Sequence, residues 1–274
     1  MAQVSRRPRT LLITPYPPTP PLGGGRRRQL ELLRWLAGRT DLTLATVVFG
    51  PEDVDALDRV LPAEVSTMWG RPVRGALNRK LPLALQWCWS AALQDSIRKE
   101  HARLPFEAVV VSHSYAFVYA GQLDVPRVVV DAQNVEHRLF EQFSRLRRRE
   151  RALIRRLAGK PGLGFLAASR TAASLRRLEH EVWGLADAIL CVSRQEQAMV
   201  AEIAGPRSLY VPNCAAAPGR PLPGPVPGAG GRGRRRSWGR RGFGDRRSPP
   251  PSLAPACLRK GWRRPSPIPR APAA

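Results

Sequence analysis

Two short runs of β-branched residues place the strongest constraint on the fold of this chain. Residues 108–112 (AVVVS) and 127–131 (RVVVD) are almost continuously apolar, and each ends in a polar residue. Strands of this kind are buried on both faces, which is typical of a parallel sheet with helices on each side. We therefore expect both segments to lie inside an α/β domain.

Strand-like and helix-like patterns alternate through the first 214 residues. The run TLLIT at 10–14 is followed by a loop rich in Pro and Gly, and then by leucines at helical spacing as far as Leu36. The other expected strands are 42–49, 188–192 and 208–211, and the other expected helices are 53–61, 81–99, 138–157, 171–183 and 193–203. This alternation predicts a Rossmann-like, doubly wound parallel sheet. In such sheets ligands bind at the carboxyl ends of the strands.

A run of glycines separates the first expected strand from its helix. Gly23, Gly24 and Gly25 are followed directly by Arg26. Glycines let a backbone approach a phosphate, and the N–H groups at the start of a helix attract anions. The spacing is neither that of a dinucleotide-binding motif nor that of a Walker loop. The segment is therefore either a phosphate contact or an ordinary tight turn.

Polar side chains follow both of the β-branched runs. They are His113 after the first run, and Gln133, Asn134, Glu136 and His137 after the second. Because parallel strands end at the same edge of a sheet, these side chains are expected to form one polar rim. Each of them alone is typical of a loop-capping residue, but together they favour a polar ligand site. The histidines and cysteines lack metal-ligand spacing, so we expect no metal.

The composition bounds the cellular setting. Four widely separated cysteines suggest neither a disulfide framework nor a zinc ribbon. No apolar run approaches the roughly 18–20 residues of a spanning helix. We therefore expect a cytoplasmic protein. The Arg-rich stretch at 145–157 is typical of a solvated helix face, or of a helix that lies on an anionic membrane at the periphery.

Residues 215–274 differ abruptly from the rest. They contain 14 basic residues, a single acid, Asp245, and 13 Pro and 10 Gly. Such a segment cannot bury enough apolar area to offset its chain entropy, so we expect it to be disordered. It is either a basic arm that binds nucleic acid or an anionic surface, or an out-of-frame translation of GC-rich DNA. We favour the second interpretation, so the net charge of +24 is a poor guide to partners and nucleic acid is not an expected one.

Four segments, taken in order, carry a family resemblance. They are TPYPPTPPLGGGRRRQLELLRWLA from residue 14, DAQNVEH at 131–137, RLEHEVWGLADAILCVSRQEQAMV at 177–200, and VPN at 211–213. Together they resemble the N-terminal half of a GT-B glycosyltransferase of the retaining, family-four kind. The resemblance covers about residues 10–214.

The resemblance implies a two-domain enzyme that transfers a sugar from a nucleotide-sugar donor to an acceptor hydroxyl, without a metal or other cofactor. Residues 1–214 correspond to the domain that mostly binds the acceptor, a glycan or a lipid-linked molecule, and Gly23 and Gly24 correspond to its donor-phosphate loop. Gln133 stands where many relatives have a histidine in a D-x-H-N-x-E motif. Ser193 and Asn213 resemble positions where the chain turns toward the cleft between the domains.

The resemblance stops after residue 214. The family's second domain binds the donor and carries two glutamates separated by seven residues, whereas residues 215–274 contain no glutamate. We therefore expect this chain to be inactive as written, because transfer needs contacts from both halves. Two competing hypotheses are a non-enzymatic basic protein that binds through residues 215–274, and a small α/β protein that holds a phosphorylated metabolite near His113 and Gln133.

Overall fold

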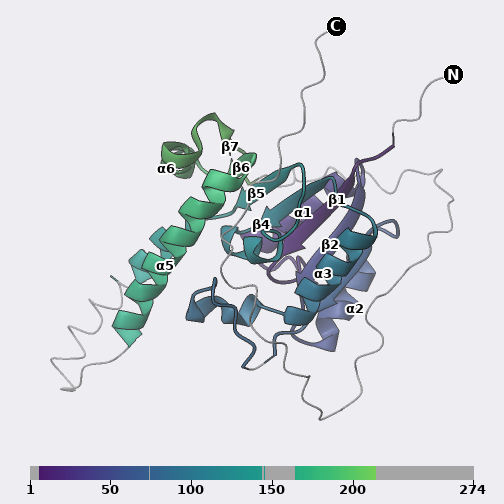
Figure 1. Ribbon diagram of the computed structural model, residues 1–274, viewed down its shortest axis with the longest axis horizontal. Helices are drawn as coiled ribbons and strands as arrows, with labels where there is room; N and C mark the ends of the chain where they lie inside the picture. Colours follow the sequence, from purple (N-terminus) through teal and green to yellow (C-terminus); the bar gives the residue numbers. More distant parts are fainter. Residues whose placement is uncertain (1–5, 74, 144, 146–163, 214–274) are drawn as a thin grey trace, which may run out of the picture.

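The computed structural model describes residues 6–73, 75–143, 145 and 164–213, and only the backbone of residues 164–169 (Figure 1). The expected helix at 138–157 falls largely outside this part of the chain, although residues 136–143 are helical. The tail at 215–274 and the hypotheses that rest on it also lie outside the described residues.

Within these residues, the strands form a single seven-stranded sheet in the order β3-β2-β1-β4-β5-β6-β7, and every neighbouring pair is parallel. The strands are β1 (Arg9–Thr14), β2 (Asp41–Val47), β3 (Ser66–Gly70), β4 (Ala108–Ser112), β5 (Val128–Ala132), β6 (Ala188–Cys191) and β7 (Ser208–Tyr210). The predicted doubly wound parallel sheet is confirmed. The two β-branched runs form β4 and β5, which lie side by side near the centre of the sheet as their apolar composition requires.

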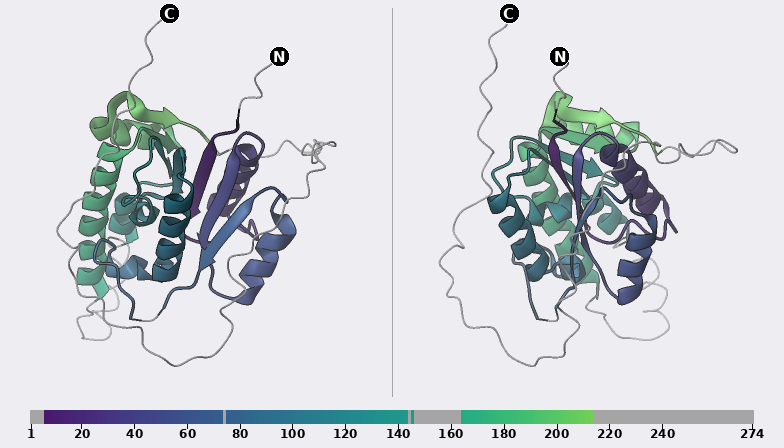
Figure 2. Two further views of the ribbon diagram at one scale, coloured as in Figure 1. Left: turned by 45° about the vertical axis from the view of Figure 1, so that its right-hand side comes forward. Right: turned by 90° about the vertical axis from the view of Figure 1, so that its right-hand side faces the viewer.

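Helices cover both faces of the sheet and give the molecule three layers (Figure 2). α1 (Gly24–Ala37) and α2 (Pro51–Val60) pack on one face, where their leucines meet Leu12 and Val110. α3 (Ala91–Arg103), α5 (Gly164–Leu185) and α6 (Arg194–Ala204) pack on the other face, against the larger apolar cluster. The strand order reverses between β1 and β4, so the carboxyl ends of these two strands mark the place where a ligand is expected.

The structure corrects the prediction of one continuous helix at 81–99. A 3-10 helix (Leu83–Cys88) ends before α3 begins, and Ser90 caps α3 by accepting a hydrogen bond from the Leu93 N–H. The buried Tyr119 hydroxyl accepts from the Ser90 N–H at 2.6 Å and donates to the Cys88 carbonyl at 2.8 Å. A side chain from a distant segment thus pairs the backbone groups that a continuous helix would pair internally.

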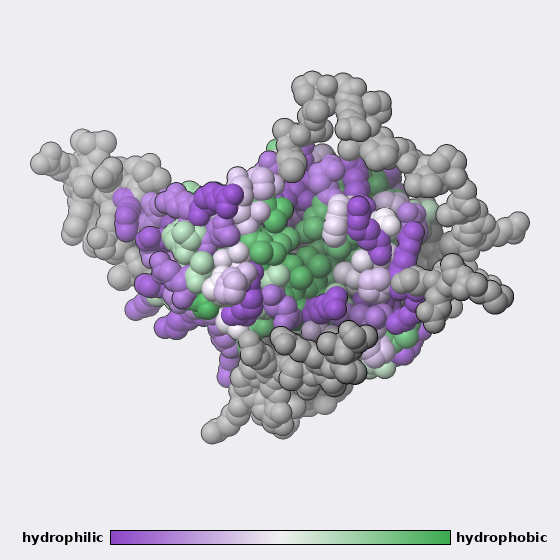
Figure 3. Space-filling view, turned by 90° about the horizontal axis from the view of Figure 1, so that it is seen from above, coloured by the Kyte–Doolittle hydropathy of each residue, from purple (hydrophilic) through white to green (hydrophobic). Residues whose placement is uncertain are grey.

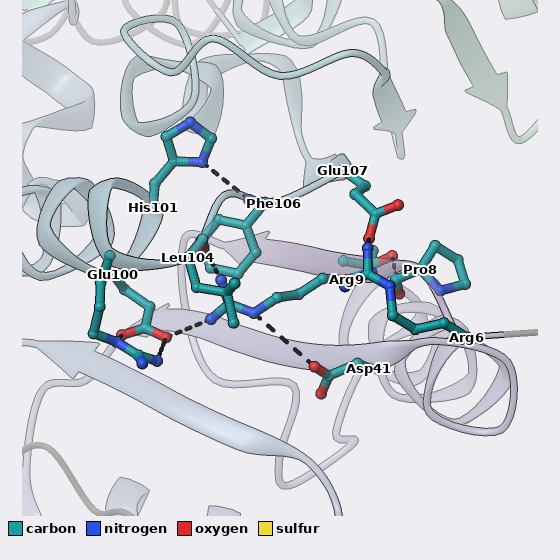
Figure 4. Close-up of polar contacts among 11 residues, drawn as sticks. Arg6, Pro8, Arg9, Asp41, Glu100, His101, Leu104, Phe106 and Glu107 are labelled. Carbon is teal, nitrogen blue, oxygen red and sulfur yellow. Dashed lines mark hydrogen bonds and ion pairs between the residues drawn. The ribbon is translucent and has the colours of Figure 1, made fainter.

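The amino ends of the strands are held by a buried cation. Arg9 at the start of β1 pairs with the Glu100 carboxylate and donates to the Leu104 carbonyl, and its guanidinium lies 4.4 Å from the centre of the Phe106 ring (Figure 4).

Seen from above, the molecule shows apolar residues gathered near its centre with hydrophilic residues around them (Figure 3). In the described part of the chain, no helix combines the length and the apolarity needed to cross a bilayer.

Candidate functional site

Three side chains at the carboxyl edge of the sheet form one hydrogen-bonded series. Tyr16 lies in the loop after β1, His113 directly follows β4, and Glu136 lies a few residues beyond β5. The Tyr16 hydroxyl is 2.8 Å from His113 Nε2, and His113 Nδ1 is 2.8 Å from Glu136 Oε1. The structure therefore brings together two of the predicted rim residues, His113 and Glu136, and adds Tyr16.

The His113 backbone adopts a conformation that residues other than glycine rarely take, with φ at 67°. Its N–H donates to the Asp131 carbonyl at 3.0 Å, and its ring stacks on Tyr115 with the ring centres 5.1 Å apart. Non-glycine residues in this region persist where the surroundings fix them, and they cluster at functional sites. The orientation of the imidazole is thus set by its backbone and by contacts on several sides.

The two contacts of the His113 ring fit one arrangement of protons. In the tautomer that carries its proton on Nδ1, the ring donates to Glu136 Oε1, and Nε2 accepts the Tyr16 O–H. Burial, with a smaller effect of the Glu136 charge, raises the pKa of Tyr16 to about 12. Tyr16 therefore keeps its proton at neutral pH and directs it to the imidazole. The Gln29 side chain also hydrogen-bonds to the phenol, which leaves one lone pair of its oxygen for a donor on a ligand.

The start of α1 lies beside this series and is open. Gly23 is extended, no described side chain caps this end of the helix, and the first turn contains no acid. A Cβ atom at Gly23 or Gly24 would meet nothing within 4 Å, whereas one at Gly25 would lie 2.5 Å from Gln133 Oε1 and 3.2 Å from the Tyr16 hydroxyl. Unpaired helix N–H groups next to open space form a place where an anion can bind.

Gln133 contributes a buried oxygen to the same place. Its side-chain nitrogen donates to Ser112 Oγ at 2.8 Å, while Oε1 has no hydrogen-bond partner among the described residues. Only 6% of Gln133 is exposed, so this unpaired oxygen carries a desolvation cost of about 1–3 kcal/mol. A ligand hydroxyl or amine at the start of α1 would remove that cost.

The arginines that follow the glycines have separate roles. Arg26 lies over the Tyr16 ring at 5.6 Å from its centre, at the edge of the open space. Arg28 instead pairs with the buried Asp131 at 2.7 Å and donates to the Val211 carbonyl at 2.8 Å. Arg26 is therefore the cation placed to meet an anionic ligand, and Arg28 is a structural cation.

The other predicted rim residues lie apart from this group. Asn134 and Ser193 line a separate cavity of ≈510 Å³ between the segment after β5 and the start of α6. Ser193 caps α6 by accepting from the Glu196 N–H at 3.1 Å. Asn213 Oδ1 accepts from Arg28 at 3.3 Å beside the end of β7. The residues expected at a single rim are therefore divided among separate local groups.

His137 does not face the open site but packs against α5, where it contacts the buried Glu179. Its Nδ1 lies 2.7 Å from Glu179 Oε2, and the backbone N–H groups of Glu136 and His137 donate to the same carboxylate at 2.8 and 2.9 Å. Glu179 thereby caps the helix that starts at residue 136 and holds Glu136 in place. Burial raises the pKa of Glu179, while His137 counteracts the shift.

No pattern in the sequence marks Tyr16, Gln29 or Glu179 as site residues. Gln29 and Glu179 each interrupt the apolar stripe of a helix, and both are fully buried. Buried polar residues must find hydrogen-bond partners, so such interruptions are a usable signal for polar contacts beneath a site. Gln29 donates to Ser112 Oγ at 3.0 Å, next to Gln133.

Metal binding and thiol chemistry find few suitable groups among the described residues. Over residues 6–73, 75–143, 145 and 164–213, no three His, Cys, Asp or Glu side chains are grouped to hold a metal ion. Burial raises the pKa of the Cys88 thiol to about 12 and that of Cys191 to about 11. Neither of these two thiols is a ready nucleophile at neutral pH.

No protein-family model and no curated protein matches this sequence. Among solved structures, the chain is distantly similar to GT-B glycosyltransferases. A UDP-glucosyltransferase from Polygonum tinctorium is 16% identical with a TM-score of 0.47, and the match covers 79% of this chain and 55% of that one. Sucrose-phosphate synthase from Thermosynechococcus elongatus is 13% identical with a TM-score of 0.48, covering 76% of this chain and 48% of the other.

The calicheamicin glycosyltransferase CalG4 is 16% identical with a TM-score of 0.44, covering 80% of this chain and 55% of that one. This chain therefore spans about half the length of the solved structures that it matches. At these identities the likeness is one of fold.

Proposed function

We propose that this chain is the acceptor-side domain of a glycosyltransferase that uses a nucleotide-sugar donor. The observation that supports this most is the uncapped, glycine-built start of α1, which faces the unpaired Gln133 oxygen. This arrangement offers N–H donors to a diphosphate and a carbonyl acceptor to a sugar hydroxyl within one small space. The ordered sequence segments that resemble retaining family-four glycosyltransferases favour the same ligand.

Each group then has a role in transfer. The N–H groups of Gly24 and Gly25, with the helix dipole and Arg26, stabilise the charge that develops on the diphosphate as its bond to the anomeric carbon breaks. Gln133 accepts a hydrogen bond from a hydroxyl of the donor. The Tyr16 oxygen, held by His113 and Glu136, accepts one from a bound hydroxyl and so positions it.

The proposal can be tested by binding alone, so it does not require turnover by the 274-residue chain. We expect inorganic pyrophosphate and nucleoside-diphosphate sugars to shift the amide NMR signals of Gly23, Gly24 and Gly25 at millimolar concentrations. Gly24 is the first residue of α1, a position that tolerates proline. Gly24→Pro therefore removes one N–H donor without breaking the helix.

A matched control is Ala91→Pro, which makes the same change at the first residue of α3. A charge-assisted hydrogen bond of about 1.5–3 kcal/mol corresponds to a loss of roughly tenfold or more in affinity. We expect this loss in Gly24→Pro and unchanged binding in Ala91→Pro. Equal affinity in the two variants, or no shift at the three glycines, would overturn the proposal.

A further inference from the structure

The segment between β3 and α3 exposes apolar side chains along a loop, of which the structure describes all residues but 74. Val73 is 64% exposed, Leu77 63% and Leu83 79%, and Trp87 follows at 42%. The segment runs below the carboxyl ends of the strands, at the bottom of the molecule in Figure 2. Large exposed apolar side chains concentrated in one short segment favour an interaction surface there.

This loop is held in shape from within. Gln86 accepts from the Asn78 N–H at 2.9 Å and donates to the carbonyls of Asn78 and Leu81, both at 2.8 Å. At its two ends, Arg71 donates to the Phe49 carbonyl at 3.1 Å, and the Trp87 ring lies 5.9 Å from that of Phe49. The leucines are therefore presented by a braced loop, and their exposure is a fixed feature of the surface.

The charge of the segment is one-sided. Residues 65–94 contain four basic residues, Arg71, Arg74, Arg79 and Lys80, and no Asp or Glu. Acids from other elements act next to it: Asp53 accepts from the Phe49 N–H, and the charge of Glu181 on α5 acts on Lys80. Arg71 and Arg79 remain exposed beside the leucines. A partner for this surface must accept leucine side chains and carry negative charge.

We infer that the described residues of the segment 71–87 form a docking surface for an anionic phospholipid bilayer. Side chains that are 63–79% exposed stand off the protein, and a rigid partner surface would need a matching pocket for each such residue. The acyl region of a bilayer accepts protruding leucines without one, while Arg71 and Arg79 lie at the level of the phosphates. Trp87 at the base of the loop is the residue type that favours the interface between water and lipid.

The docking surface at residues 71–87 is in contact with the candidate site. The Trp87 ring stacks on Tyr16 with the ring centres 6.3 Å apart. Docking through residues 71–87 would therefore bring the candidate site next to the bilayer, where an acceptor carried on a lipid is found. The surface itself does not depend on the proposed function, because vesicle binding and pyrophosphate binding are separate measurements.

The test is sedimentation of the full chain with vesicles of phosphatidylcholine and phosphatidylglycerol, at low and at high salt. Leu77→Asp/Leu83→Asp is compared with Leu104→Asp/Leu209→Asp, which makes the same chemical change at leucines 42% and 45% exposed elsewhere. Both pairs add equal negative charge, so attraction through the basic residues at 215–274 is reduced equally in the two variants.

We expect Leu77→Asp/Leu83→Asp to lower vesicle affinity by roughly tenfold or more, because leucine side chains leave the acyl region. The control pair should stay within about twofold of the unsubstituted chain at high salt, where long-range charge effects are screened. Equal binding by the two double variants would overturn the inference. So would equal binding of the unsubstituted chain to vesicles of phosphatidylcholine alone, since the anionic lipid would then have no role.

Discussion

The buried carboxylate of Glu179 gives the sharpest test of how this fold holds its site. Glu179 accepts from two backbone N–H groups at the start of the helix at 136 and from His137 Nδ1, at 2.8, 2.9 and 2.7 Å. Glu179→Ala removes all three acceptor contacts from a place that water does not reach. It also frees the backbone of Glu136, which orients His113.

The size of the effect follows from these contacts. Hydrogen bonds to a charged group are worth about 1.5–3 kcal/mol each, but burying the carboxylate has its own cost, which the raised pKa of Glu179 shows. Breaking a buried pair by removing one partner typically costs about 3–5 kcal/mol. We expect a loss of that size in the free energy of unfolding, or about 10 °C in the midpoint of thermal unfolding.

Urea unfolding of the full chain, followed by circular dichroism, measures this loss. Glu181→Ala is the control, because Glu181 lies on the same helix but is exposed, and it should change stability by less than about 1 kcal/mol. If Glu179→Ala destabilises the protein by no more than Glu181→Ala, the contacts at the helix start do not stabilise the fold.

Three further predictions concern the edge of the sheet. Gly25→Ala places a methyl group 2.5 Å from a buried amide oxygen and should cost about 1–3 kcal/mol in urea unfolding, whereas Gly24→Ala enters open space and should be close to neutral. Arg28→Ala leaves the fully buried Asp131 without its cation and should cost about 3–5 kcal/mol; a smaller loss in Arg28→Ala than in Gly25→Ala would count against this. Because folding raises the pKa of Tyr16 from 10.0 to about 12, the folded state holds this proton more tightly, and stability should fall as the pH rises from 10.0 toward 12. In Tyr16→Phe that part of the fall should disappear; an identical pH dependence in the two proteins would refute the role of Tyr16.

The sequence predicts those parts of the fold that are set by local composition. The runs of valine in β4 and β5 are continuous enough to require burial on both faces, and the Ser193–Glu196 spacing marks the start of α6. β3 was not predicted, because STMWG has neither a continuous apolar run nor a clear alternation. It becomes a strand by pairing with β2.

The rest depends on contacts between distant segments. The break before α3 is stabilised by the hydroxyl of Tyr119, 29 residues beyond Ser90. In the same way, His113 and Glu136 were expected at one edge, but the link through Tyr16 spans 97 residues of sequence. Local patterns carry no information about such pairings, so the sequence predicts which edge is polar but not which residues touch.

The bridge made by Arg28 has a mechanical consequence. One guanidinium joins α1 and β5 to the chain that leaves the sheet, through the Val211 carbonyl and Asn213. Tension applied to the chain beyond residue 213 would therefore load this ion pair before it could peel the three-residue strand β7 from the sheet edge. α1, whose amino end forms the candidate anion site, is tied through Arg28 to the chain beyond residue 213. Pulling or twisting the chain at that point would therefore act directly on the candidate site.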